Sequence, residues 1–189
     1  MKRRISLAET LGIVAVFAAG FAAMRDGSPL VYGAVYSLTL LALLITLLAA
    51  WVGPTPRPGC RGFAVFGWAY FLLAFVPAIQ STIGKDLGTA GVFQGIGFRF
   101  HRAPDVPSSL ASQLTGGVSA YEVALMRSMQ TPRDPAIDSY LQGYSAYITR
   151  ATNSERIGNL LLCWLFGLAG LVLGRVIASR GQPEDPVVH

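Results

Sequence analysis

The stretch 62–80, GFAVFGWAYFLLAFVPAIQ, decides the fold class of this chain. It contains no formal charge, yet it carries Trp68, Tyr70 and four phenylalanines. About 20 apolar residues in a helix are enough to cross the roughly 30 Å hydrocarbon core of a bilayer. The stretch also lacks the polar face that an amphipathic helix of a soluble protein needs. It is therefore predicted to be a membrane span.

Three further stretches share this character, and the four predicted spans are 5–24, 30–52, 62–83 and 157–177. The composition agrees, because 52% of the residues are hydrophobic and 13% are charged, whereas about 25% are charged in a typical soluble domain. In lipid every backbone polar group must be satisfied internally, so each span has to be helical. The predicted fold is all-α, a four-helix transmembrane bundle.

The basic residues predict the orientation of this bundle. They gather in the N-terminal segment 1–4, between the second and third spans, and at the start of the tail 178–189. Lys and Arg in short loops mark the cytoplasmic side. Both termini are therefore expected in the cytoplasm of a bacterium, with the protein in its cytoplasmic (inner) membrane. The start of the chain also fits a signal peptide, but its apolar core is long for one and no A-x-A site follows it.

The segment 84–156 is the only sizeable polar region and is expected to face outward. Its first part is rich in Gly, Pro and Ser and is predicted to be irregular. Ser119 and Glu122 then have the spacing of a capping box, and Asp134 before Pro135 is typical of a helix start. Short helices are predicted over 119–130 and 135–150. The second is compatible with running on into the fourth span, with or without a break near 152–154.

Small residues indicate where helices pack. Gly167, Gly170 and Gly174 lie on one face of the fourth span, and Gly33 with Ser37 forms a small-xxx-small pair in the second. Such positions let helices approach closely in lipid. Packing within one chain is the favoured interpretation, and contact with a second copy or another membrane subunit is the alternative.

Polar residues near the ends of the spans have structural interpretations too. Ser6 and Glu9 have capping-box spacing, which favours an N-cap over a buried proton site. Gln80 and Asn159 would line a polar path in a transporter. The favoured roles are satisfaction of backbone carbonyls freed by Pro77 for Gln80 and an interhelical hydrogen bond for Asn159.

Catalytic and ligand motifs are not apparent. Two cysteines and two histidines, far apart in sequence, do not form a metal-ligand pattern. The glycines around Gly84 do not match a P-loop, so no cofactor is predicted. His101 with Asp105 is the one conceivable acid/base pair, supported by proximity alone. The basic residues do not alternate with aromatics on a polar segment, which argues against nucleic acid as a partner.

The spans nevertheless carry a resemblance. The segments RRISLAETLGIVAVFAAGFAAMRDGSPLVYGAVYSLTLLALLITLLAA, RGFAVFGWAYFLLAF and RIGNLLLCWLFGLAGLVLGR resemble a family of small uncharacterised multi-span membrane proteins common in planctomycete-type bacteria. The resemblance covers roughly 3–76 and 156–175 and implies the same order of spans. It implies no catalytic residue.

The sequence thus favours a non-enzymatic integral membrane protein. It would act as an accessory or assembly component through helix packing and its outer loop. The alternative is a small oligomeric transporter or channel. The expected partners are the lipid bilayer and either other membrane subunits or further copies of the chain.

Overall fold

A computed structural model describes residues 7–52, 58–76, 79, 88–111, 119–130 and 134–180. All the regular structure in these ranges is helical, as predicted. The helices are α1 (Leu7–Asp26), α2 (Pro29–Trp51), α3 (Pro58–Phe75), α5 (Gly88–Phe100), α6 (Ser108–Ala111), α7 (Ala120–Gln130) and α8 (Pro135–Arg180).

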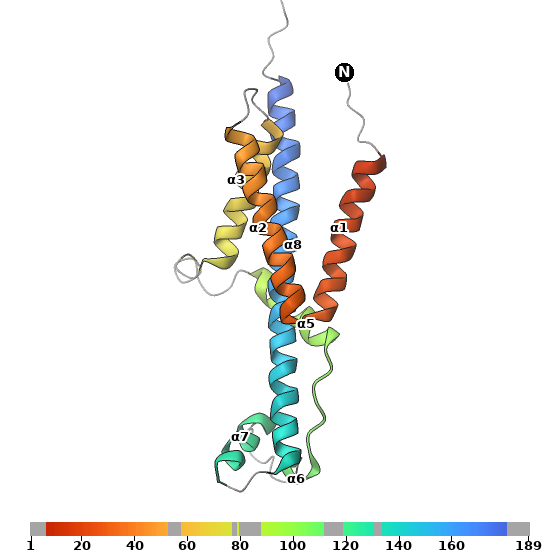
Figure 1. Ribbon diagram of the computed structural model, residues 1–189, viewed down its shortest axis with the longest axis vertical. Helices are drawn as coiled ribbons and strands as arrows, with labels where there is room; N and C mark the ends of the chain where they lie inside the picture. Colours follow the sequence, from red (N-terminus) through yellow and green to blue (C-terminus); the bar gives the residue numbers. More distant parts are fainter. Residues whose placement is uncertain are drawn as a thin grey trace, which may run out of the picture.

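Helix α8 is the axis of the molecule and runs along almost its whole length (Figure 1). At 1.5 Å per residue, its 46 residues span about 70 Å. Its C-terminal half packs with α1, α2 and α3, and its N-terminal half extends beyond them to α6 and α7 (Figure 1). The N-terminal end of α1 and the C-terminal end of α8 lie at the same end of the molecule.

Two of the described helices, α2 and α8, are long and apolar enough to cross a membrane. The outer face of α2 carries exposed leucine and isoleucine side chains, among them Leu38 (63% exposed), Ile45 (55%) and Leu48 (60%). Because such a face is costly in water, these helices indicate association with a membrane. Residues 5 and 6 of the predicted first span lie outside the described residues.

The turn between α1 and α2 has a clear local cause. Gly27 closes α1 with φ +60°, a conformation that residues with a β-carbon rarely adopt, and its N–H donates to the Ala23 carbonyl over 3.0 Å. Ser28 then caps α2 by accepting from the Val31 N–H, and Pro29 occupies the first helical position.

Helix α3 differs from the predicted span 62–83. It begins at Pro58 and ends at Phe75, and Val76 is no longer helical. The helix ends there because a residue that precedes proline is disfavoured in the α conformation. Gln80 lies outside the described residues, and so does Pro77.

The prediction of an irregular segment after residue 84 is wrong for Gly88–Phe100, which forms α5. The reason is tertiary. A β-carbon at Gly97 would lie 2.7 Å from the Ala151 carbonyl oxygen, and one at Gly158 would lie 2.5 Å from the Phe93 ring. These glycines allow α5 and α8 to pack closely, so they are packing residues rather than loop residues.

Helices α7 and α8 begin at the predicted caps. Ser119 and Glu122 form the reciprocal capping box of α7, with N–H to oxygen distances of 3.0 and 3.3 Å. The Asp134 carboxylate accepts from the Ala136 N–H at the start of α8. The possible break near 152–154 is absent, because α8 continues through it. A small core of Leu110, Ala124, Ile137 and Tyr140 joins α6, α7 and α8.

Candidate functional site

Helices α3 and α8 are in close backbone contact. A β-carbon on Gly170 would collide with the carbonyl oxygen of Gly62, and one on Gly174 would collide with the carbonyl oxygen of Pro58. One on Gly167 would lie 2.8 Å from the ring of Phe63. The three glycines singled out in the fourth span therefore all lie against α3. The backbones approach closely because no side chain stands between them.

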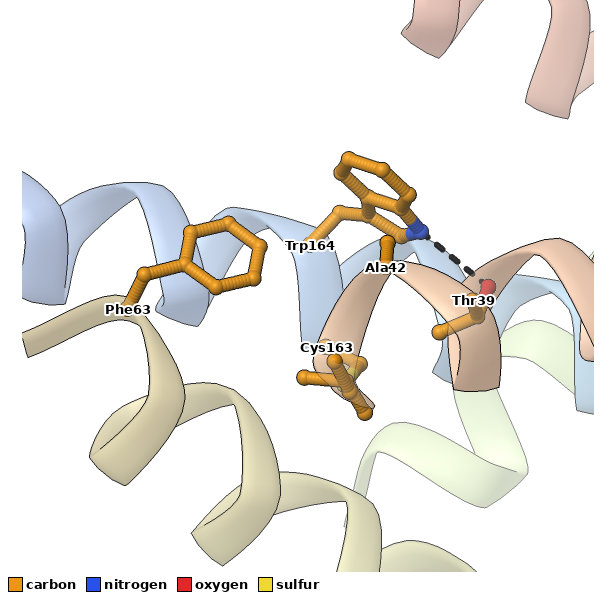
Figure 2. A pocket seen from close by; sticks show the side chains of 6 residues that line it. Thr39, Ala42, Phe63, Cys163 and Trp164 are labelled. Atoms are coloured by element: carbon orange, nitrogen blue, oxygen red, sulfur yellow. Dashed lines mark hydrogen bonds between the residues drawn. The ribbon is translucent and has the colours of Figure 1, made fainter. Parts of the chain in front are cut away.

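Polar side chains join the same helices across the bundle. Trp164 Nε1 donates to Thr39 Oγ1 over 3.1 Å, joining α8 to α2 (Figure 2). Tyr70 donates its hydroxyl proton to Asn159 Oδ1 over 3.2 Å, joining α3 to α8. Asn159 is buried, and its side chain makes the interhelical hydrogen bond that was predicted for it. The Cys163 thiol donates to the Gly67 carbonyl oxygen over 3.1 Å.

The space between α2, α3 and α8 is dry. Thr39, Ala42, Leu43, Phe63, Cys163 and Trp164 line a small cavity there (Figure 2). It has no room for a water molecule. The Thr39 hydroxyl also bonds back to the Val35 carbonyl of its own helix. The polar atoms of Thr39 and Trp164 are therefore paired with protein atoms and do not line a water path.

The remaining candidates lie elsewhere. A β-carbon on Gly33 would meet no atom within 4 Å, and Ser37 is exposed, so this pair lies on a face of α2 that no described element covers. Ser6 lies outside the described residues. Glu9 lies in α1, but its side chain is outside what the structure describes.

A polar junction forms where the α1–α2 turn, the end of α5 and the middle of α8 meet. Its centre is Ser154, fully buried, whose hydroxyl lies 2.6 Å from the Met24 carbonyl oxygen and 2.8 Å from that of Arg150. His101 Nε2 lies 3.1 Å from the same hydroxyl. Asn153 donates to the Gly27 carbonyl over 3.1 Å.

The protonation states in this junction follow from its hydrogen bonds. The Ser154 proton goes to a carbonyl, so its oxygen accepts and His101 must carry a proton on Nε2. Burial lowers the pKa of His101, and the charge of Arg150 lowers it further, although Asp26 acts in the opposite direction. His101 is therefore neutral at neutral pH. Hydrogen bonds from Ser28 lower the pKa of Asp26.

The serine and histidine do not have the arrangement of a nucleophile and its base. In such a pair the serine proton points to the histidine and the oxygen faces a substrate. Here the oxygen is buried and its proton bonds a carbonyl. The pairing of His101 with Asp105 is wrong: Asp105 accepts from Arg102 over 3.5 Å on an exposed surface, and His101 bonds Ser154.

Beside the junction, an open groove of about 490 Å³ lies between α8 and the segment that begins at the end of α5. Its wall includes His101, Arg102, Tyr147 and Arg150. Arg102 already faces the Asp105 carboxylate. Groups of three or more metal-binding side chains are not found among the residues that the structure describes.

The roles of Ser154, Asn153 and Gly27 were not predicted from the sequence. One signal was available: two adjacent polar residues, Asn153 and Ser154, directly precede an apolar run, and Gly27 precedes a Ser-Pro pair. Neither pattern says that the two segments meet.

The contacts define a helical protein in which two helices, α2 and α8, are long and apolar enough to cross a membrane. The long α8 also joins the α1–α3 bundle to the short helices α6 and α7. No family model, curated protein or solved structure matches the chain.

Proposed function

We propose that the chain is an integral protein of the bacterial cytoplasmic membrane. Its spans would be α1 as far as Met24, α2, α3 and the part of α8 over 157–177, with both termini in the cytoplasm. The arrangement of helix ends supports this, because the end of α2, the start of α3 and the end of α8 lie together, opposite α6 and α7 (Figure 1).

Within the membrane we propose a non-enzymatic accessory or assembly role. One observation carries this proposal: Thr39 and Trp164 bond across helices beside a cavity with no room for water, and the buried Tyr70 and Asn159 join α3 to α8. Such pairs stabilise helix association and specify its geometry. A transport path would instead need polar atoms that face a water-filled cavity.

The outer part supplies a surface for partners. The N-terminal half of α8, with α6 and α7, extends well beyond α1–α3 (Figure 1). Helix α7 exposes Met126 and Met129, which are 55% and 77% exposed. Methionine is common on binding surfaces because its side chain adapts to many shapes. Contact of this surface with a membrane or extracytoplasmic subunit fits an assembly role.

A small oligomeric transporter or channel is the second candidate. A transport path would have to run along a groove of the proposed spans. The groove formed by α1, α2 and α8, about 420 Å³, is lined almost wholly by apolar side chains such as Val16, Leu38 and Leu161. An apolar groove favours acyl chains over a water-soluble solute. Solute flux into vesicles that contain the purified protein would support the transporter and overturn the accessory role.

Topology is tested with the two native cysteines. Cys60 is partly exposed near the start of α3, and Cys163 is buried. A membrane-impermeant maleimide should label Cys60 in inverted membrane vesicles but not in intact spheroplasts. The Cys60→Ser variant should lose that label and serves as the control. Labelling of Cys60 from the outside would reverse the proposed orientation, and a chain that stayed in solution without detergent would overturn the membrane location.

The accessory role is tested by crosslinking in intact membranes, mild solubilisation and identification of the co-purified proteins. A defined partner whose crosslink is lost when Met126 and Met129 are both changed to Ser would support the role. Recovery of a lone monomer under the same conditions would contradict it.

A further inference from the structure

A second groove, between α2 and α3, has the features of a lipid-binding site. Its volume is about 540 Å³, and Leu47, Val65 and Leu72 form apolar parts of its wall. Trp51, Trp68 and Arg61 also line it. The groove thus combines a surface suited to a hydrocarbon chain with a single guanidinium group.

Arg61 is held in place by the backbone of the neighbouring helix. Its Nε donates to the Ala50 carbonyl oxygen over 3.4 Å, at the last turn of α2. The other guanidinium nitrogens then remain for a ligand, because the one ion pair among the described residues joins Arg102 to Asp105. A positive group that has no carboxylate partner among the described residues, at the end of an apolar groove, is complementary to an anionic head group.

The two indoles lie at different levels along α2, with Trp51 at its end and Trp68 beside Leu43, about two turns earlier. Trp51 is 81% exposed at the C-terminal end of α2, and Trp68 donates its Nε1 proton to the Leu43 carbonyl over 3.4 Å. Tryptophan side chains are enriched at the boundary between hydrocarbon and head groups. Trp51 therefore lies where the head group of a lipid in this groove would meet its acyl chain.

We propose that this groove binds one anionic phospholipid. An acyl chain would lie along Leu47, Val65 and Leu72, and the phosphate would lie beside Arg61. Basic pockets between helices on the cytoplasmic side are typical sites for such head groups, and the proposed topology puts Arg61 on that side. The inference rests on the proposed membrane location and adds a specific ligand class to it.

The test uses the tryptophans as reporters. The full chain is reconstituted into phosphatidylcholine vesicles in which a rising fraction is replaced by acyl-brominated phosphatidylglycerol, and tryptophan fluorescence is measured. Acyl-brominated phosphatidylcholine at equal fractions measures quenching by the general lipid shell. Since one Arg near the surface contributes about a fivefold preference for anionic lipid, we expect saturable quenching by phosphatidylglycerol with about fivefold higher apparent affinity.

Variants assign the preference to the groove. Arg61→Gln should abolish the preference for phosphatidylglycerol, so that the two brominated lipids have about equal apparent affinity. Quenching by phosphatidylcholine should stay unchanged. Arg25→Gln, at the opposite end of the bundle, should keep the preference, and Trp51→Phe should remove much of the saturable signal. Circular dichroism of Arg61→Gln checks that it is folded, and Arg61→Lys, which keeps the charge, should retain most of the preference.

The contrary outcomes distinguish a failure of the lipid site from a failure of the proposed membrane location. Equal quenching by the two brominated lipids, or a preference that survives Arg61→Gln, would overturn the lipid site alone. Weak quenching by both lipids that increases on dilution of the protein in the bilayer would indicate a second copy in the groove and also overturn the site. Failure of the chain to float with vesicles would overturn the proposed membrane location.

Discussion

The carbonyl oxygen of Gly62 occupies the position that a β-carbon on Gly170 would need, so the backbones of α3 and α8 touch directly at this crossing. This contact sets the separation of the two helices. Phe63 packs beside it against Gly167, and Cys163 bonds the Gly67 carbonyl one turn further along. The geometry of the bundle therefore depends on the absence of side chains at a few positions.

Gly170→Ala should separate α3 from α8. The added methyl group meets backbone, which cannot move aside by a rotamer change, so we expect a loss of about 1–3 kcal/mol in the free energy of unfolding. Unfolding in mixed micelles, followed by tryptophan fluorescence, measures this. Gly12→Ala is the control, because a β-carbon there meets no atom within 4 Å. Equal stability of the Gly170 and Gly12 variants would contradict the close contact.

Thr39→Val tests the bond between α2 and α8. Valine has nearly the shape of threonine but leaves Trp164 Nε1 without its acceptor, so we expect a loss of about 1 kcal/mol in the free energy of unfolding. Thr46→Val is the matched control on the same helix, because within the described part of the chain the Thr46 hydroxyl bonds only to α2 carbonyls, those of Ala42 and Leu43. A loss of the same size in both variants would assign the effect to helix propensity instead.

Ser154→Ala should loosen the polar junction. It removes the donor to the Met24 carbonyl and the acceptor for His101, and leaving buried groups unpaired costs about 1–3 kcal/mol. Hydrogen exchange should become faster at the N–H groups of residues 27–32 in the α1–α2 turn. Ser179→Ala, on the exposed end of the same helix, should have no such effect. Unchanged exchange in the Ser154 variant would show that the hydroxyl does not hold the turn.

The junction should weaken as the pH falls. Burial and Arg150 hold the pKa of His101 below its ordinary value of 6.5. The unfolded chain therefore takes up a proton at a higher pH than the folded chain does. The stabilisation from neutral His101 is complete above pH 6.5 and is lost as the pH falls toward the lowered value.

Melting temperature at several pH values between about 5 and 8 measures this dependence. His101→Gln, which keeps a donor near the Nε2 position, should reduce the change in melting temperature over this range. Asp26 titrates lower, since its pKa lies below 3.8, and does not account for a change near pH 6. An identical pH profile in the Gln variant would exclude His101 as the cause.

The sequence alone determined most of the helices, though not α5 or α6, and several of their ends. Hydropathy over about 20 residues is a local property, and it located α1 and α2 to within two residues. The capping box located α7 to within one residue. Capping depends on residues only three positions apart, so the Ser119–Glu122 box could also be predicted. The ends of α3 were predicted less well, because Pro77 stops the helix inside an apolar stretch.

Only the tertiary structure decided which polar groups meet and which glycines pack. Ser154 bonds a carbonyl 130 positions away, and no local pattern encodes that distance. Gly97 was assigned to a loop because glycine commonly marks one, but its missing side chain serves the approach of α5 to Ala151. Local hydrophobicity and capping act along the chain, whereas close packing and buried hydrogen bonds exist only once distant segments are side by side.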